Sequence, residues 1–168
     1  MSNLGLHKFM QEENLKLLCA DVGDRNVLEM MQREGMSLGG EQSGHVIFLD
    51  DLTTGDGQLC ALHFLAILAA SGKPLSELSG RIATYPQVLL NIEGPHSAAE
   101  KQALLEHPVL QAAIEEKTRE MAGDGRILVR ASGTEALIRV MVEAATEQTA
   151  QSVAKALADI VESVQKTK

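Results

Sequence analysis

An almost uninterrupted apolar run from Leu59 to Ala70 is the feature that most constrains the fold of this chain. The run fits a helix that opens at Asp56 and is apolar nearly all round, and the Gly72-Lys73-Pro74 segment ends it, because glycine stops a helix and proline cannot continue one. A helix without a polar face has to be buried against other elements. The run is interrupted by His63 and is too short to cross a bilayer, so we expect it inside a folded domain.

The sequence before this helix supplies few elements that could bury it. Residues 1–13 fit a helix, Leu15–Ala20 a short buried strand and Val46–Leu49 an apolar strand, and Asp24 can cap a helix that continues through Arg33. Two strands are too few for a complete layer. We therefore predict that residues 1–80 are part of an α/β domain.

The pattern changes between residues 73 and 84, where we place a domain boundary. Residues 81–168 alternate strand and helix patterns and form a self-contained unit, so we predict a complete small α+β domain, an antiparallel sheet with helices packed on it. Its predicted strands are Gln87–Ile92, Arg126–Arg130 and Leu137–Glu143, and its predicted helices are Ser97–Leu105, Pro108–Ala122 and Glu147–Gln165.

Charge and composition exclude several classes of partner. Among 168 residues, 15 Lys and Arg stand against 23 Asp and Glu, a net charge of −8, and only 2% of the residues are aromatic. This balance argues against a broad nucleic-acid or anionic-membrane surface and leaves room for a small pocket that binds one anion. Cys19 and Cys60 have apolar neighbours, which predicts two reduced thiols in a core. With no secretory signal visible, we expect a cytoplasmic protein.

The segment from Arg130 to Arg139 carries the sharpest chemical signal. A turn between two predicted strands holds Ser132, Gly133 and Thr134, with an arginine at each flank. Glycine lets backbone N–H groups turn inward, hydroxyls add donors, and arginine offers a planar pair of donors to a phosphate. These residues predict an anion site, and the alternative is a polar hairpin with two solvated arginines.

A second short segment, Gly39-Gly40-Glu41-Gln42-Ser43-Gly44-His45, gathers a carboxylate, an amide, a hydroxyl and an imidazole. Such a set suits vicinal sugar hydroxyls: Glu41 accepts from two of them, Ser43 supports it, and His45 can exchange a proton near neutral pH. The alternative is an ordinary glycine-rich connection whose polar groups face water.

No metal site is predicted. The Asp50–Asp56 segment lacks an acidic or amide side chain at the third and fifth positions of a calcium loop, and Ala61 occupies the twelfth. The remaining histidines show no metal-ligand spacing: His7, His63, His96 and His107.

In this order and at this separation, the two segments resemble the C-terminal part of the phosphohexose mutase superfamily, and within it the phosphoglucosamine mutase family most of all. The resemblance covers essentially the whole chain. It is carried by Val22–Val27, Leu38–His45, Thr53–Gly57, Tyr85–Val88 and Arg130–Glu143.

The resemblance implies a four-domain enzyme that interconverts glucosamine 6-phosphate and glucosamine 1-phosphate. Such an enzyme uses a phosphoserine, a bisphosphate intermediate and Mg²⁺ held by an Asp-rich loop in its second domain. Glu41 and Ser43 match the family's sugar-contacting loop, with His45 as a candidate for proton transfer. Asp24 and Arg25 are expected to line the same cleft. Arg130, Ser132, Gly133 and Thr134 match the loop that clamps the non-reacting phosphate, and Arg139 belongs to the same anion site.

Two departures from the family pattern stand out. Ala131 and Ala136 replace two prolines of Arg-Pro-Ser-Gly-Thr-Glu-Pro, which should leave the free loop more mobile. The chain also contains neither a Ser-His-Asn-Pro segment nor an Asp-x-Asp-x-Asp-Arg loop. It should therefore bind no Mg²⁺, hold no catalytic residue other than the proton-transfer candidate His45, and be inactive without the N-terminal domains of the enzyme.

Three alternatives stay open. The chain could come from a phosphomannomutase or phosphoglucomutase, because substrate choice rests on few contacts. It could also be a stand-alone, non-catalytic module that binds a phosphosugar. An open sheet edge in the first half could lead to homo-oligomers through strand pairing.

Overall fold

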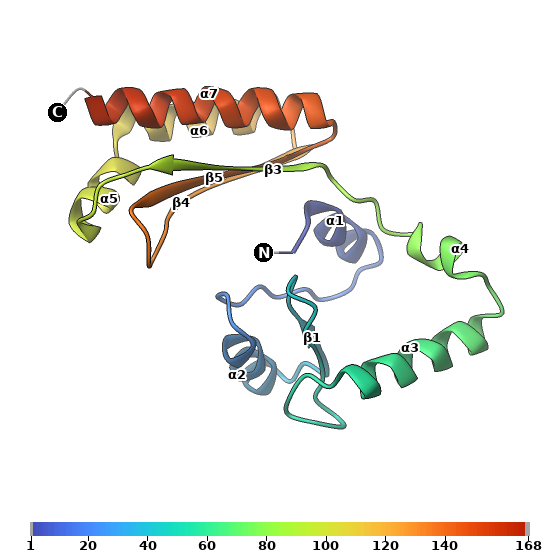
Figure 1. Ribbon diagram of the computed structural model, residues 1–168. Helices are drawn as coiled ribbons and strands as arrows, with labels where there is room; N and C mark the ends of the chain where they lie inside the picture. Colours follow the sequence, from blue (N-terminus) through green and yellow to red (C-terminus); the bar gives the residue numbers. More distant parts are fainter. Residues whose placement is uncertain (1, 167–168) are drawn as a thin grey trace. The chain divides into compact units, whose positions relative to one another are not determined.

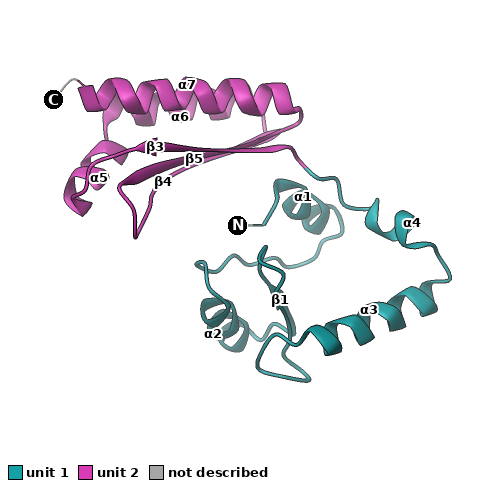
Figure 2. Ribbon diagram, viewed as in Figure 1, with its two compact units in different colours: residues 1–84 teal, residues 85–168 magenta. Residues whose placement is uncertain are grey.

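The computed structural model describes residues 2–166, and the chain divides into two compact units, Met1–Thr84 and Tyr85–Lys168 (Figures 1 and 2). Each unit contains both helices and strands. Among residues 2–166, no helix combines the length and the apolar character that a membrane span requires.

Unit 1, the first of these, is built from helices and one short hairpin. Asn3 caps its first helix by accepting a hydrogen bond from the Gly5 N–H, and Asp56 caps α3 by accepting from the N–H groups of Gln58 and Leu59, as predicted for that helix. The elements are α1 (Leu4–Glu12), α2 (Asp24–Glu34), β1 (Leu38–Gly40), β2 (Val46–Phe48), α3 (Gly57–Ser71) and α4 (Leu75–Ser79).

The core of unit 1 is small. Within residues 2–84, Met31 and Ile47 are the only buried apolar side chains, and they join α2 to the hairpin. The prediction that α3 is buried is wrong for the described part of the chain: none of its residues is buried, and Leu62 and Ile67 are 66% and 61% exposed. The apolar pattern predicts the helix correctly, but no described element forms a layer that covers it.

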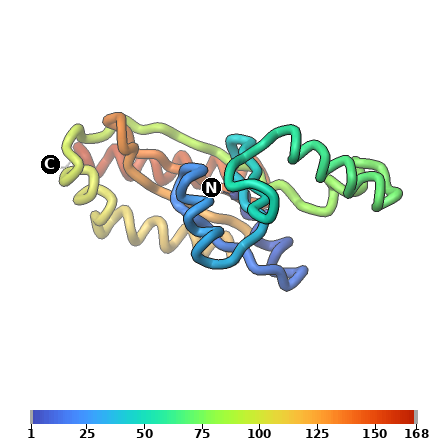
Figure 3. The backbone as a smooth tube through the Cα atoms, turned by 90° about the horizontal axis from the view of Figure 1, so that it is seen from below, coloured from blue at the N-terminus to red at the C-terminus, as the bar shows by residue number. Residues whose placement is uncertain are grey.

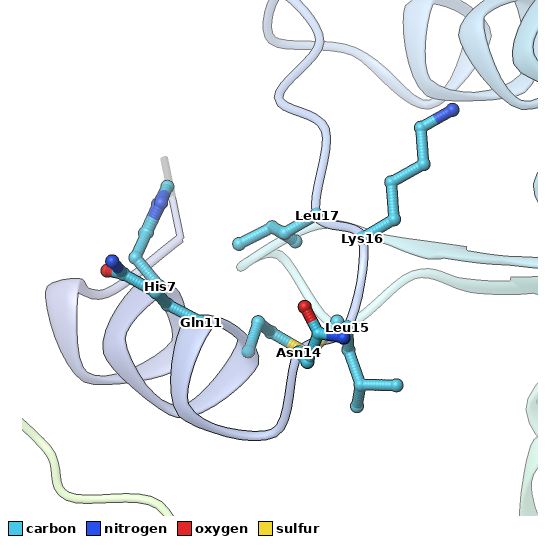
Figure 4. Close-up of a pocket in the computed structure, with 7 residues that line it drawn as sticks. His7, Gln11, Asn14, Leu15, Lys16 and Leu17 are labelled. Atoms are coloured by element: carbon cyan, nitrogen blue, oxygen red, sulfur yellow. The ribbon is translucent and has the colours of Figure 1, made fainter.

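Residues 15–20 do not form the buried strand that the sequence predicts. They belong to no strand or helix. Leu15 and Leu18 are exposed, and Cys19 is exposed rather than in a core, while Cys60 is half-buried. An apolar run becomes a strand only where a neighbouring strand accepts its hydrogen bonds. Here the run borders an open hollow of about 540 Å³ beside α1, into which Leu17 points while Lys16 extends away (Figure 4).

Three smaller differences concern one helix start and two short elements. Asp24 is the first residue of α2, and Gly23 rather than Asp24 is the capping residue. The glycine-rich strand β1 and the one-turn helix α4 were not predicted, because Leu38-Gly39-Gly40 lacks the β-branched residues that mark a strand and α4 is only five residues long.

Unit 2, which covers Tyr85–Lys168, is the predicted α+β arrangement of an antiparallel sheet with helices on it. The strand order is β3-β5-β4, so the last strand of the chain is the central one. The elements are β3 (Gln87–Glu93), α5 (Ala98–Leu105), α6 (Pro108–Glu120), β4 (Gly125–Ala131), β5 (Leu137–Ala144) and α7 (Glu147–Lys166).

One face of this sheet carries the core. Helices α6 and α7 run along that face in both views (Figures 1 and 3), and Leu110 of α6 and Leu157 of α7 are fully buried against Val140 and Val142 of β5. Because side chains alternate along a strand, the residues between the core positions lie on the opposite face of the sheet. The β4–β5 turn joins the ends of these two strands at the edge of that opposite face.

Candidate functional site

The turn between β4 and β5 contains the predicted anion-binding residues. The Ser132 N–H donates to the carbonyl oxygen of Leu137 at 2.8 Å, which closes the hairpin, and the Glu135 N–H donates to Ser132 Oγ at 3.3 Å. Gly133 and Thr134 are exposed at the tip, and no described residue accepts a hydrogen bond from their backbone N–H groups. These two N–H groups are therefore available to an acceptor from outside the chain.

Arg130 and Arg139 lie directly opposite each other on β4 and β5, and both are on the face away from α7. Like charges opposite each other on neighbouring strands are unfavourable on their own. Two guanidinium groups beside exposed N–H groups form a locally basic site in a chain whose net charge is −8. A bound anion would relieve the repulsion.

A carboxylate of the turn itself occupies part of this basic site. Glu135 Oε2 accepts from an Arg139 terminal nitrogen at 2.8 Å and from Ser132 Oγ at 3.4 Å. Ser132 is 4% exposed as a residue, and its hydroxyl already has a partner in Glu135. The buried Nε of Arg139 has no hydrogen-bond partner among the described residues. The Glu135 carboxylate therefore compensates part of the positive charge of this site.

Gly133 serves the turn in a way that the sequence did not indicate. Its φ is not in the left-handed region, so the turn does not need glycine for its backbone path. A Cβ built at this position would meet open space. The absence of a side chain leaves the outer side of the turn clear, where a ligand could approach the N–H groups.

The β1–β2 loop brings together the three predicted sugar-binding residues. The Glu41 N–H donates to the carbonyl oxygen of His45 at 2.9 Å, and Gly44 takes a φ of 98°, which a glycine adopts without strain. Ser43 Oγ donates to Glu41 Oε2 at 3.1 Å and lies 3.3 Å from His45 Nδ1. The three polar groups form one connected cluster at the tip of the hairpin.

Glu41 also ties this cluster to the start of α2. Its Oε1 accepts a hydrogen bond from the Gly23 N–H at 2.6 Å. A carboxylate at a helix N-terminus is favourable because of the helix dipole. Asp24 and Arg25, predicted to line the same cleft, follow directly; both are exposed, and the hydrogen bond and charge of Glu29 raise the pKa of the Arg25 guanidinium.

The order of contacts in this cluster excludes a serine-nucleophile triad. In such a triad the carboxylate orients the histidine, and the histidine takes the proton of the serine. Here the Glu41 carboxylate accepts from Ser43 Oγ, and the His45 ring has Ser43 as its neighbour instead of the carboxylate. The cluster is suited to accepting and donating hydrogen bonds to several hydroxyl groups of a ligand.

Three aspartates between β2 and α3 do not form a metal site. Asp50 accepts from Ser37 Oγ, Asp51 lies 2.9 Å from His63 Nε2, and Asp56 caps α3, so each is used in its own local contact. Among residues 2–166, no group of three or more His, Cys, Asp and Glu side chains could hold a metal ion. Residues 2–166 therefore offer no ligand set that fits Mg²⁺.

The structure thus gathers the predicted residues into two groups. Glu41, Ser43 and His45 lie with the N-terminal end of α2 in unit 1, and the phosphate-binding residues Arg130, Ser132, Gly133, Thr134 and Arg139 lie around the β4–β5 turn in unit 2. Two participants were missed: the Gly23 N–H, because backbone donors leave no sequence signal, and Glu135, which the Ser-Gly-Thr-Glu order could have indicated as a capping carboxylate.

Comparison with protein families identifies the chain. Residues 1–85 match the phosphoglucomutase/phosphomannomutase α/β/α domain III, and residues 84–160 match the C-terminal domain of the same family. The chain belongs to the phosphoglucomutase/phosphomannomutase family.

Curated relatives of the chain include proteins named phosphoglucosamine mutase. The one from Levilactobacillus brevis is 51% identical over 161 residues, and the one from Geobacillus kaustophilus is 47% identical over 161 residues. Each alignment covers 96% of this chain and 35% of the relative, so the chain spans about a third of the length of the relatives that it matches.

Solved structures share the fold at low identity. Aspergillus fumigatus N-acetylphosphoglucosamine mutase superimposes with a TM-score of 0.78 at 22% identity, over 95% of this chain and 36% of that one. An N-acetylglucosamine-phosphate mutase in its substrate complex gives a TM-score of 0.72, also at 22% identity, over 95% of this chain and 37% of that one.

Proposed function

We propose that the chain supplies the sugar- and phosphate-binding loops of a phosphoglucosamine mutase, an enzyme that interconverts glucosamine 6-phosphate and glucosamine 1-phosphate. The observation that carries the proposal is the opposed pair Arg130 and Arg139 beside the open N–H groups of Gly133 and Thr134. The relatives at 47–51% identity support the amino-sugar substrate over other hexoses.

In this proposal the β4–β5 turn holds the phosphate that is not transferred. Arg130 and Arg139 neutralise its charge, and Gly133 and Thr134 donate backbone hydrogen bonds. None of these donors distinguishes which carbon of the sugar carries the phosphate. A turn of this kind can therefore hold a substrate that reorients between two phosphoryl transfers, because either phosphate fits the same donors.

The β1–β2 loop is proposed to hold the sugar hydroxyls. Glu41 would accept from two neighbouring hydroxyls while the Gly23 N–H fixes the carboxylate, and Ser43 would add one donor or acceptor. His45 is exposed and near Ser43, so it is placed to exchange a proton with a bound hydroxyl group.

The phosphoryl transfer itself requires parts outside this sequence. The chain has neither a Ser-His-Asn-Pro segment nor an Asp-x-Asp-x-Asp-Arg loop, and we propose that the N-terminal domains of the enzyme supply them. We therefore expect no conversion of glucosamine 6-phosphate by the purified chain in a coupled assay. Turnover at the rate of a complete mutase would contradict this division of labour.

Binding of glucosamine 6-phosphate to the purified chain, followed by NMR titration, tests the proposal directly. We expect the amide signals of Gly133 and Thr134 to shift with wild-type protein and to shift far less with Arg130→Ala. Arg119→Ala, which removes an exposed arginine of α6 in the same unit, is the matched control and should bind as wild type. Equal binding by Arg130→Ala and Arg119→Ala would exclude the phosphate site.

The remaining alternatives appear as other outcomes of the same titration. Mannose 6-phosphate or glucose 6-phosphate that binds more tightly than glucosamine 6-phosphate would favour a phosphomannomutase or phosphoglucomutase. Inorganic phosphate that binds as tightly as all three sugars would indicate that the chain by itself recognises only the phosphate group.

A further inference from the structure

A buried lysine that no prediction singled out lies against the β4–β5 turn. Lys101 of α5 is 8% exposed, and its Nζ donates to the carbonyl oxygens of Ser132 at 3.0 Å and Glu135 at 2.6 Å. Lysine is almost never buried without a partner that compensates its charge. Among the described residues, Lys101 Nζ has two backbone carbonyl oxygens as partners and forms no ion pair with a carboxylate.

These two hydrogen bonds fix the orientation of the turn. In a trans peptide, the C=O of one residue and the N–H of the next point in opposite directions, and the described chain has no cis peptide. With the Ser132 carbonyl held toward Lys101, the Gly133 N–H points away from the lysine. That N–H has no hydrogen-bond partner among the described residues. Lys101 thus contacts the inner side of the turn, and the Gly133 N–H lies on the outer side of the turn.

No other feature of the turn fixes its two carbonyl groups in this way. Ala131 and Ala136 flank it, so no proline restricts the backbone there. The Ser132 N–H and the Ala136 carbonyl are paired, with Leu137 and Gly94 respectively, and these contacts hold the base of the turn rather than its tip. Figure 1 shows α5 at the same end of the sheet as the turn, which brings Lys101 within reach.

The charge of Lys101 adds to the basic site. Lys101, Arg130 and Arg139 provide three cations around the turn, and Glu135 provides one carboxylate. A cation that is largely removed from water is screened less than an exposed one, so its potential reaches the outer side of the turn. A phosphate dianion would compensate this excess.

We propose that Lys101 is the positioning residue of the phosphate-binding turn: it orients the Ser132–Gly133 and Glu135–Ala136 peptides so that the Gly133 N–H faces the bound phosphate. The inference rests on the proposed function, because it assigns Lys101 to the same anion site. In this inference the anion cannot bind well without Lys101, although Lys101 does not contact the anion itself.

The test compares Lys101→Met, Lys101→Arg and the matched control Lys155→Met, an exposed lysine of α7 in the same unit. Inorganic phosphate and glucosamine 6-phosphate are titrated into each purified full chain and followed by NMR. We expect Lys101→Met to keep the dispersed spectrum of unit 2, to bind phosphate roughly tenfold more weakly or worse, and to lose the phosphate-induced shift of the Gly133 amide. Lys101→Arg should recover part of both, and Lys155→Met should equal wild type.

Arg130→Ala separates failure of this inference from failure of the proposed function. Wild-type affinity and an unchanged Gly133 shift in Lys101→Met, together with lost binding in Arg130→Ala, would overturn the role of Lys101 and leave the site standing. No effect of either substitution would overturn both. If Lys101→Met does not fold, Lys101→Gln takes its place, with a smaller loss expected; unfolding of both variants would show a general structural role and also overturn the proposal.

Discussion

Gly133 illustrates how a single residue can matter for binding without mattering for folding. A Cβ at this position meets no atom within contact distance, and its φ is not one that disfavours a side chain. The residue is nevertheless at the centre of the exposed donors. In the proposed function its role is to leave room for a ligand, so stability and binding should respond differently to its replacement.

We expect Gly133→Ala to leave thermal stability nearly unchanged and to weaken phosphate binding by roughly tenfold, because the methyl group stands where the anion approaches. Thermal unfolding and phosphate titration measure the two effects. A large drop in the unfolding temperature with unchanged affinity would show that the glycine is structural after all.

Glu135 should act in the opposite direction to the arginines. Its carboxylate accepts from Arg139 and Ser132, so it would compete for both donors with a phosphate bound as we propose. We expect Glu135→Gln to raise phosphate affinity by roughly threefold or more, because it removes a negative charge next to the anion. Glu115→Gln, on the exposed side of α6, is the matched control for the change in net charge; equal effects of the two would refute direct competition.

At the scale of elements, the contact between β1 and α2 positions the β1–β2 loop. A Cβ built on Gly39 would collide with Met31 Sδ and would lie 2.9 Å from a Val27 methyl group, so the strand approaches the helix closely only because the residue is glycine. This contact carries the hairpin whose loop contains Glu41, and Met31 is one of the few buried apolar residues in unit 1.

We expect Gly39→Ala to destabilise unit 1 by about 1–3 kcal/mol, because overpacking forces β1 away from α2. Gly57→Ala at the start of α3 has open space for its Cβ and should be neutral or slightly stabilising. Hydrogen exchange of the β1 and β2 amides measures the difference. Equal exchange in the two variants would mean that the hairpin does not depend on this contact.

Most elements could be predicted from the sequence, because their signals are local. Leu157 and Val161 recur at helical spacing in α7, and the β-branched runs around Val129 and Val140 mark two strands. The prediction of a strand at Leu15–Ala20 was wrong, because strand pairing depends on residues that are distant in the sequence. The contacts of the site were equally out of reach: Lys101 stands among Ala, Glu and Gln, a pattern typical of a solvated helix face, so nothing in it indicated burial.

At the scale of the whole molecule, the two units differ in how much apolar surface they bury. Unit 2 packs a continuous core from the sheet, α6 and α7, whereas the buried apolar core described in unit 1 consists of Met31 and Ile47. Because local stability follows buried contacts, we expect hydrogen exchange to be faster in unit 1 and unit 2 to retain its protection longer as denaturant is added.

The same substitution in two helices tests this contrast. Leu157→Ala, at a position with no exposure, should lower the free energy of unfolding of unit 2 by about 2–5 kcal/mol. Leu62→Ala, 66% exposed on α3, should change the free energy of unfolding by no more than about 0.5 kcal/mol. Chemical denaturation followed by circular dichroism compares them, and a large loss at Leu62 would show that α3 is covered in solution.

The strand order of unit 2 also determines when the turn between β4 and β5 can form during synthesis. Strand β3 pairs only with β5, which is made after α5, α6 and β4, so β3 has no hydrogen-bonded neighbour until residues 137–144 have emerged from the ribosome. Contacts that join distant segments form late and leave strand edges open in the meantime. The β4–β5 turn, for which we propose phosphate binding, leads into β5 and is therefore assembled in the same late step that closes the sheet.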